Sequence, residues 1–206
     1  MLKLNYIIPQ RRAELVRNRI VEILTAELEN QALNYVPECE TKVFGERFTP
    51  LDQNELSVVN VSLFKITSDN KHQGSKDCEC QFNIDVFCRA KSKEDMPGVI
   101  RMGDSLAQLK MQRLTECIDY ILEDPQFRNL LFPIPFISRV WVSDVTFFEQ
   151  DPAEGSNVSV GRLIFHVIVN ETNKLLEGNL IESIYTDLKF NQTENGIEYI
   201  WQANQI

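Results

Sequence analysis

Cysteine is the residue type with which this sequence could most readily do chemistry. Three of its five cysteines, Cys78, Cys80 and Cys88, fall in the stretch DCECQFNIDVFCRA, residues 77–90. Zinc sites separate paired cysteines by roughly two to four residues and need a second pair, and redox pairs read C-x-x-C at a helix N-terminus. Neither pattern is present. The alternation predicts instead a strand on whose apolar side cysteine packs as a small hydrophobic residue; that side is Cys80, Phe82, Ile84, Val86 and Cys88.

The two histidines offer little further chemistry. His72 lies in a polar segment, and His166 lies in an apolar stretch beside Ile164 and Ile168, where a structural imidazole is favoured over a catalytic one. The sequence contains no G-x-S-x-G, H-E-x-x-H or glycine-rich phosphate-binding motif. No pair of its carboxylates has a spacing that demands acid–base catalysis. We therefore expect no enzyme activity: no catalytic residue, no cofactor and no metal site.

Charge and hydropathy narrow the classes of partner. The 206 residues carry a formal net charge of -9, which disfavours specific nucleic acid binding because phosphate contacts need a surplus of Lys and Arg. The basic residues Arg11, Arg12, Arg17 and Arg19 are predicted to form a charged outer helix face. No apolar run reaches the roughly 18 to 20 residues that cross a bilayer, so no membrane partner is expected. An N-terminus unlike a signal peptide and an odd number of cysteines indicate synthesis in a reducing cytoplasm.

Hydrophobic periodicity predicts an α+β protein: a mostly antiparallel sheet flanked by two amphipathic helices, with a C-terminal β-rich extension. The helices are expected within residues 10–32 and 99–124, where apolar residues recur every three or four positions. In the second helix the predicted stripe includes Leu109. Strands are expected at residues 40–48, 55–67, 80–90, 138–150 and 156–172. Along the second of these, alternation places Val59, Val61, Leu63 and Lys65 on one side, and Phe64 and Ile66 on the other.

The remaining segments set the expected domain organisation. The polar stretch SDNKHQGSKD, residues 68–77, is predicted to be the mobile loop of a long hairpin. One α+β domain is expected over residues 1–172, followed by a C-terminal extension, residues 173–206, that forms a hairpin around TENG. Trp141 is expected in the core. Trp201, close to the C-terminus, is predicted to make an intermolecular contact.

The order of these elements resembles a known family. An amphipathic helix is followed by GERFTPLDQNELSVVNVSLFKIT, a polar loop, the strand CQFNIDVFCRA and the helix DSLAQLKMQRLTECIDYILED. The hairpin VWVSDVTFFEQDPAEGSNVSVGRLIFHVIV then closes the unit. Over roughly residues 10–172, this arrangement resembles the tail terminator (tail completion, neck) proteins of tailed bacteriophages.

The resemblance implies a structural virion protein that caps the end of the tail tube as a homohexameric ring. Such a ring stops tube polymerisation and joins the tail to the neck and head. Its implied partners are further copies of itself, the tube protein, neck or head-completion proteins and, in a contractile tail, the sheath. It would be located in the virion and, during assembly, in the host cytoplasm. The residues expected to contact partners are Ser68, Asn70, Lys71, His72, Lys76 and Trp201.

Other functions stay open on the sequence alone. One is another head–tail connector or neck subunit, which would share the same α+β pattern. Another is a small cytoplasmic enzyme whose site is built between subunits, with a deep pocket lined by His166 or by converging carboxylates. A nucleic-acid-binding module is the weakest alternative because of the charge of -9.

Overall fold

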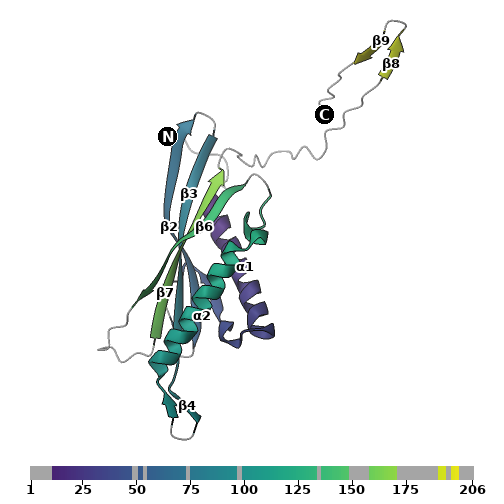
Figure 1. Cartoon of the computed structure of the whole chain (residues 1–206). Coiled ribbons are helices and arrows are strands. Elements are labelled where there is room, and N and C mark those ends of the chain that lie inside the picture. The colour runs from purple at the N-terminus through teal and green to yellow at the C-terminus, as the bar shows by residue number, and fades with distance from the viewer. Residues whose placement is uncertain are drawn as a thin grey trace, which may run out of the picture. The chain divides into compact units, whose positions relative to one another are not determined.

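A five-stranded sheet in the order β1-β2-β3-β7-β6 is the framework of the computed structural model (Figure 1). Neighbouring strands are antiparallel except β1 and β2, which are parallel. The strands are β1 Lys42–Gly45, β2 Ser57–His72, β3 Ser75–Arg89, β6 Ile137–Phe148 and β7 Val158–Asn170. The structure describes residues 11–47, 51–52, 55–72, 75–96, 99–133, 136–148, 158–170, 190–193 and 196–199.

Two long helices, α1 Arg12–Asn34 and α2 Gly103–Glu123, lie on the same face of this sheet (Figure 1). Helix α1 packs over β1 and β2, and α2 packs over β3, β6 and β7. Both helices end shortly before a proline that starts a 3-10 turn, η1 Pro37–Cys39 and η2 Pro125–Phe127, since proline cannot continue the helical hydrogen bonds. A small hairpin, β4 Lys93–Met96 and β5 Val99–Arg101, precedes α2. No helix in the described part of the chain is long and apolar enough to span a bilayer.

The chain divides into two units, Met1–Thr172 and Asn173–Ile206. In the second unit, β8 Phe190–Thr193 and β9 Gly196–Tyr199 form an antiparallel hairpin. The predicted α+β class, with a mostly antiparallel sheet, two helices and a C-terminal β-rich extension, is therefore confirmed.

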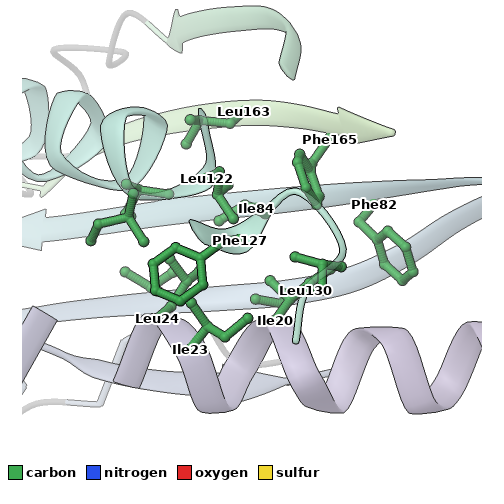
Figure 2. Packing of buried hydrophobic residues seen from close by; sticks show 14 of the residues in the cluster. Ile20, Ile23, Leu24, Phe82, Ile84, Leu122, Phe127, Leu130, Leu163 and Phe165 are labelled. Carbon is green, nitrogen blue, oxygen red and sulfur yellow. The ribbon is translucent and has the colours of Figure 1, made fainter. Parts of the chain in front are cut away.

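The core lies between the helices and one face of the sheet. Along β3 the predicted alternation is confirmed, because the five alternating residues from Cys80 to Cys88 are at most 1% exposed. Figure 2 shows Ile20 and Leu24 of α1 gathered with Phe127 and Leu130 from the segment after α2. In α2 the predicted stripe is wrong at Leu109, which is exposed. The residues of α2 that face the core are Ala107, Met111, Leu114, Thr115, Ile118, Ile121 and Leu122.

Helix α2 approaches β7 closely at one glycine. A Cβ atom added at Gly161 would lie 2.8 Å from the sulfur of Met111 and 3.0 Å from Oγ1 of Thr115. Both contacts are shorter than ordinary van der Waals separation. Because glycine has no side chain, α2 can lie closer to β7 at this position than any other residue would allow.

The predicted facing of β2 is correct up to Leu63 and wrong beyond it. The register shifts between Leu63 and Lys65, so that Leu63 lies opposite Phe82 but Lys65 lies opposite Gln81. The extra residue at this β-bulge is Phe64, and every side chain after it changes face. Ile66 consequently pairs with the buried strand position Cys80 and lies on the helix side.

The polar segment at 68–77 is a paired hairpin and not a loop. Strand β2 continues to His72 and β3 begins at Ser75, with Asp69 opposite Asp77 and His72 opposite Ser75. The prediction failed because it required apolar alternation, whereas the two strands pair here through their ladder of backbone hydrogen bonds, which any side chains permit.

The buried cysteines generate the first testable prediction. Replacing Cys80 and Cys88 together with Ala should lower the free energy of unfolding by about 1 kcal/mol per site, because each change leaves a small cavity. Urea denaturation of the purified protein measures this loss, and Cys117→Ala at a half-buried helical position is the control that should cost less. Stoichiometric zinc in the wild-type protein that disappears from the double variant would contradict a packing role.

Candidate functional site

The second face of the sheet, which we call the open face, carries the side chains that point away from both helices. The register of β6 with β7 assigns residues to this face, since side chains alternate along each strand. On β7 the buried residues face the helices and the half-buried residues face the other way. Over these two strands the residues of the open face include Arg139, Trp141, Asp144, Thr146, Phe148, Val160, Arg162, Ile164, His166 and Ile168. It therefore combines large apolar side chains with charged ones.

Three polar side chains from three strands form a connected chain on the open face. Nδ1 of His166 on β7 lies 2.7 Å from Oε1 of Glu79 on β3, and Nε2 of His166 lies 2.9 Å from Oγ of Ser143 on β6. Trp141 stacks on the imidazole, with ring centroids 4.8 Å apart, and the Arg139 guanidinium lies 4.9 Å from the centroid of the Trp141 ring. Both ring nitrogens and one ring face of the histidine are thus in contact with neighbouring side chains.

The core position predicted for Trp141 is wrong. Its strand places it opposite His166, on the open face, and it is half-buried there. An apolar pattern on both sides of β6 could not distinguish the two faces, because the sequence of a single strand does not say which face the helices cover.

The connectivity of Ser143, His166 and Glu79 is that of a nucleophile, a base and an orienting carboxylate. Sequence reasoning did not find this arrangement, since Ser143 and Glu79 lie 23 and 87 positions from His166 along the chain. Only the strand register brings the three together. The same contacts also serve as cross-strand pairs that stabilise a sheet face.

An ion pair also links β3 to β7 on the open face. Arg162 donates to both carboxylate oxygens of Asp85, at 2.6 Å from Nε and 3.1 Å from Nη2. This hydrogen bonding raises the pKa of the Arg162 guanidinium above its usual value. The guanidinium also lies 5.6 Å from the centroid of the Phe148 ring. The pair explains how Asp85 is accommodated at only 8% exposure, since a buried carboxylate needs a partner that is both charged and hydrogen-bonded.

At the other end of the open face, Arg47 fixes a segment against β2. Its backbone N–H donates to Oδ1 of Asn60 at 2.8 Å, and its guanidinium donates to both carboxylate oxygens of Glu55, at 3.0 and 2.7 Å. The Arg47 side chain also lies over the Phe44 ring, 4.6 Å from its centroid. The hydrogen bond from Arg47, reinforced by one from the backbone of Asp52, lowers the pKa of Glu55 to about 2.

The residues predicted to contact partners are only partly described. Ser68 is exposed near the distal end of β2, with its Oγ 3.3 Å from Sγ of Cys78. The backbones of Asn70, Lys71, His72 and Lys76 belong to the β2–β3 hairpin. Their side chains lie outside the described part of the structure, as does Trp201 altogether. A partner-binding role for these residues stays a prediction.

The arginines of α1 lie beside carboxylates and aromatic rings. Nη1 of Arg17 is 3.4 Å from Oε1 of Glu46, and Nη1 of Arg19 is 2.9 Å from Oε2 of Glu22. The Arg12 guanidinium lies 5.1 Å from the centroid of the Phe136 ring. These contacts are typical of a charged outer helix face.

The thiols lie in surroundings that disfavour their reactive form. Desolvation by burial raises the pKa of Cys88 and of Cys117 to about 12, and also raises the pKa of Cys39. A thiolate is the nucleophilic and metal-binding form, so these groups are poorly suited to either task. Within the described ranges, no three His, Cys, Asp or Glu side chains gather as a metal site.

Fold and surface together define a two-layer α+β protein with helices on one face of its sheet and a mixed apolar and charged open face on the other. No protein-family model matches the chain, and no curated protein matches it. Among solved structures, the chain is similar to one in the "Virion of native gene transfer agent (GTA) particle". The two are 14% identical, with a TM-score of 0.41, and the match covers 73% of this chain and 97% of that chain. A TM-score this low establishes no common fold, so the likeness carries no conclusion about function.

The Arg47–Glu55 pair predicts a pH dependence of stability. Because the folded pKa of Glu55 lies well below its ordinary value of 4.5, its contribution is complete above that value and is lost as the pH falls toward 2. The difference in unfolding free energy between wild type and Glu55→Gln should therefore be constant above about pH 5 and shrink below it. Urea titrations from pH 2 to 7 measure this difference, with the exposed Glu116→Gln as control. An equal difference at pH 3 and pH 7 would contradict the assignment.

Proposed function

We propose that this protein is a non-enzymatic structural component of a phage-like particle, which closes the end of a tail tube as a homomeric ring. In this role it stops tube polymerisation and presents a surface to the neck or head-completion proteins. The order of elements on which the sequence resemblance rests is present in the described structure: helix, hairpin, helix, hairpin. A connector or neck subunit elsewhere in the same particle is the nearest alternative.

The observation that carries the proposal is the open face over β6 and β7. Both strands hold large apolar side chains on their two faces, while the two helices cover only one. Trp141, Ile164 and Ile168 are half-buried on the open face, and Phe148 is 43% exposed. A strand with apolar side chains on both faces is typical of a sheet covered on both sides, by helices or by a neighbouring subunit.

A ring also requires a second, different surface on the same molecule, because a head-to-tail contact joins two unlike patches. The helix layer offers exposed large side chains of that kind. Leu33 and Tyr35, at the end of α1, are 77% and 72% exposed, and Tyr120 on α2 is 76% exposed. We propose that this side of one copy covers the open face of the next. The number six comes from the family resemblance alone.

Contacts with other components are assigned to the β2–β3 hairpin. Its polar residues, from Ser68 to Lys76, would meet the tube protein, and a sheath would be a further neighbour in a contractile tail. Binding through such a hairpin needs no pocket or cofactor. The net charge of -9 is compatible with a component that lies near packaged DNA without binding it tightly.

The ring is tested by native mass spectrometry and negative-stain imaging of the purified protein, and by imaging of particles that contain it. We expect six-fold rings at the end of the tail tube, with monomer alone or monomer and ring in dilute solution. The double variant Ile164→Asp, Ile168→Asp should keep its fold by circular dichroism yet fail to join rings, because a buried unpaired charge disfavours the contact. Met102→Asp, on a residue 63% exposed before α2, is the matched control and should assemble normally.

A single copy per particle, or a position away from the tail end, would contradict the proposed function. Rings formed equally well by the open-face double variant would contradict the proposed contact surface while leaving the ring itself in place.

Ester or amide hydrolysis is a second candidate function, favoured by one observation, the Ser143–His166–Glu79 connectivity. In such a reaction Oγ of Ser143 would attack a carbonyl carbon as its proton passes to Nε2 of His166, while Glu79 holds the Nδ1–H. Acyl transfer also needs preorganised donors for the developing oxyanion. Cross-strand stabilisation accounts for the same three contacts without these further requirements.

A fluorophosphonate probe separates the two candidates, since it labels only activated serines. The structural function predicts no labelling of the wild-type protein above that of Ser143→Ala, measured by intact-protein mass spectrometry. Stoichiometric labelling that is lost in both Ser143→Ala and His166→Ala would support a hydrolase in its place.

A further inference from the structure

Within the described residues, strand β2 has a free edge along its distal half. Strand β1 pairs with β2 only from Val58 to Val61, and then Glu46, at a φ of 56°, turns the chain away. The Glu46 N–H donates to the carbonyl oxygen of Val61, and its side chain accepts from the N–H of Leu63. From there β2 continues to His72, and in the described part of the chain no strand pairs with it on that side. Such an edge presents unpaired backbone groups to any compatible strand.

An apolar groove borders this edge on the helix side. Leu63 and Ile66 from β2 form one wall, and the start of α1 forms the other. Ile66 is 36% exposed and the bulged Phe64 is 64% exposed, so large apolar side chains remain uncovered here. The groove has a volume of about 210 Å³ and is lined by Arg11, Ala13, Glu14, Arg17, Leu63 and Ile66.

The segment of chain that leads into this groove has the pattern of a strand. Residues 2–8 read LKLNYII and lie outside the described structure. Leu2, Leu4, Tyr6 and Ile8 alternate with Lys3, Asn5 and Ile7, so one side of a period-two pattern is wholly apolar and the other is mixed. The chain enters the described structure at Arg11, which itself lines the groove. Seven extended residues span roughly 23 Å, close to the length of β2 from Leu63 to Asp69.

We infer that residues 2–8 add to the free edge of β2 as an antiparallel strand. The direction follows from the two anchor points. Arg11 lines the groove together with Leu63 and follows residue 8 by three positions, and β1 occupies the edge on the side of Val61, so a segment that pairs with this edge extends toward His72. That path runs opposite to β2. In that pairing the wholly apolar side, Leu2, Leu4, Tyr6 and Ile8, would face the groove, and Lys3, Asn5 and Ile7 would face the other way.

The occupant is the chain's own segment, because its attachment at Arg11 supplies a high effective concentration that a free partner lacks. Backbone pairing satisfies the exposed N–H and C=O groups, while the groove covers the apolar side chains. The added strand protects β2 from edge-to-edge pairing with other chains. This inference goes beyond the proposed function and holds whether or not the protein forms a ring.

Amide hydrogen exchange of the purified full chain tests the inference. The β2 amides between Lys65 and Ser68 that point away from β3 should exchange at least about tenfold faster after deletion of residues 2–8, since exchange reports the loss of a protecting hydrogen bond. The double variant Leu4→Asp, Tyr6→Asp should show the same effect without shortening the chain. The matched control Lys3→Ala, Asn5→Ala should keep the wild-type protection. Amides of β7 from Leu163 to Val169 serve as an internal reference and should not change.

Equal exchange of these β2 amides in the full chain and the deletion variant would overturn the inference. Protection that increases with protein concentration, together with a doubled mass by analytical ultracentrifugation, would also overturn it, because the edge would then be occupied by a second copy. Protection that is independent of concentration and lost in both variants supports the chain's own segment.

Discussion

The register of β3 between β2 and β7 is the constraint on which the rest of the structure depends. One side of β3 places cysteine, phenylalanine and aliphatic residues beneath both helices, and the other side places Glu79 and Asp85 against His166 and Arg162. A slip of one residue would exchange these two faces, putting carboxylates into the core and Phe82 into solvent. Removing a charged carboxylate from water costs more free energy than burying one apolar side chain gains. The charged side of β3 therefore fixes the strand register as strongly as the apolar side does.

The open face is stabilised in a way that leaves it usable as a contact surface. Within the sheet Asp85 is paired with Arg162, and Glu79 is hydrogen-bonded to His166, so a covering surface need not supply partners for these groups. Between these pairs lie Ile164 and Ile168, whose apolar side chains are stabilised when they are removed from water. A neighbour could therefore cover these side chains without leaving them unpaired, but Asp144, opposite Ile164, would need a partner from that neighbour. The same internal pairing stabilises these strands within the single chain.

Sequence pattern alone was sufficient for the two long helices, for the strands of the main sheet and for the cysteine-bearing side of β3, because alternation and helical spacing are local signals. It missed the β4–β5 hairpin, whose residues Val99–Arg101 it included in the second helical stretch. The pattern gave the wrong facing where one extra residue is inserted into a strand. The bulge at Phe64 reversed the facing of Ile66, and no local feature marks such an insertion. It failed again for the 68–77 hairpin, whose pairing depends on the backbone. The Ser143–His166–Glu79 contacts were beyond reach for a third reason, since they exist only once three strands are aligned.

The close approach of α2 to β7 at Gly161 has a consequence for the history of the sequence. Space for a side chain at 161 is taken by the Met111 sulfur and the Thr115 hydroxyl, so each of these three positions limits what the others can become. A relative with alanine at 161 would need a smaller or differently placed residue at 111, or a helix shifted outward. Substitutions at positions 111 and 161 should therefore occur together among relatives. The contact between α2 and β7 would then diverge slowly, even where the surface residues of the protein change freely.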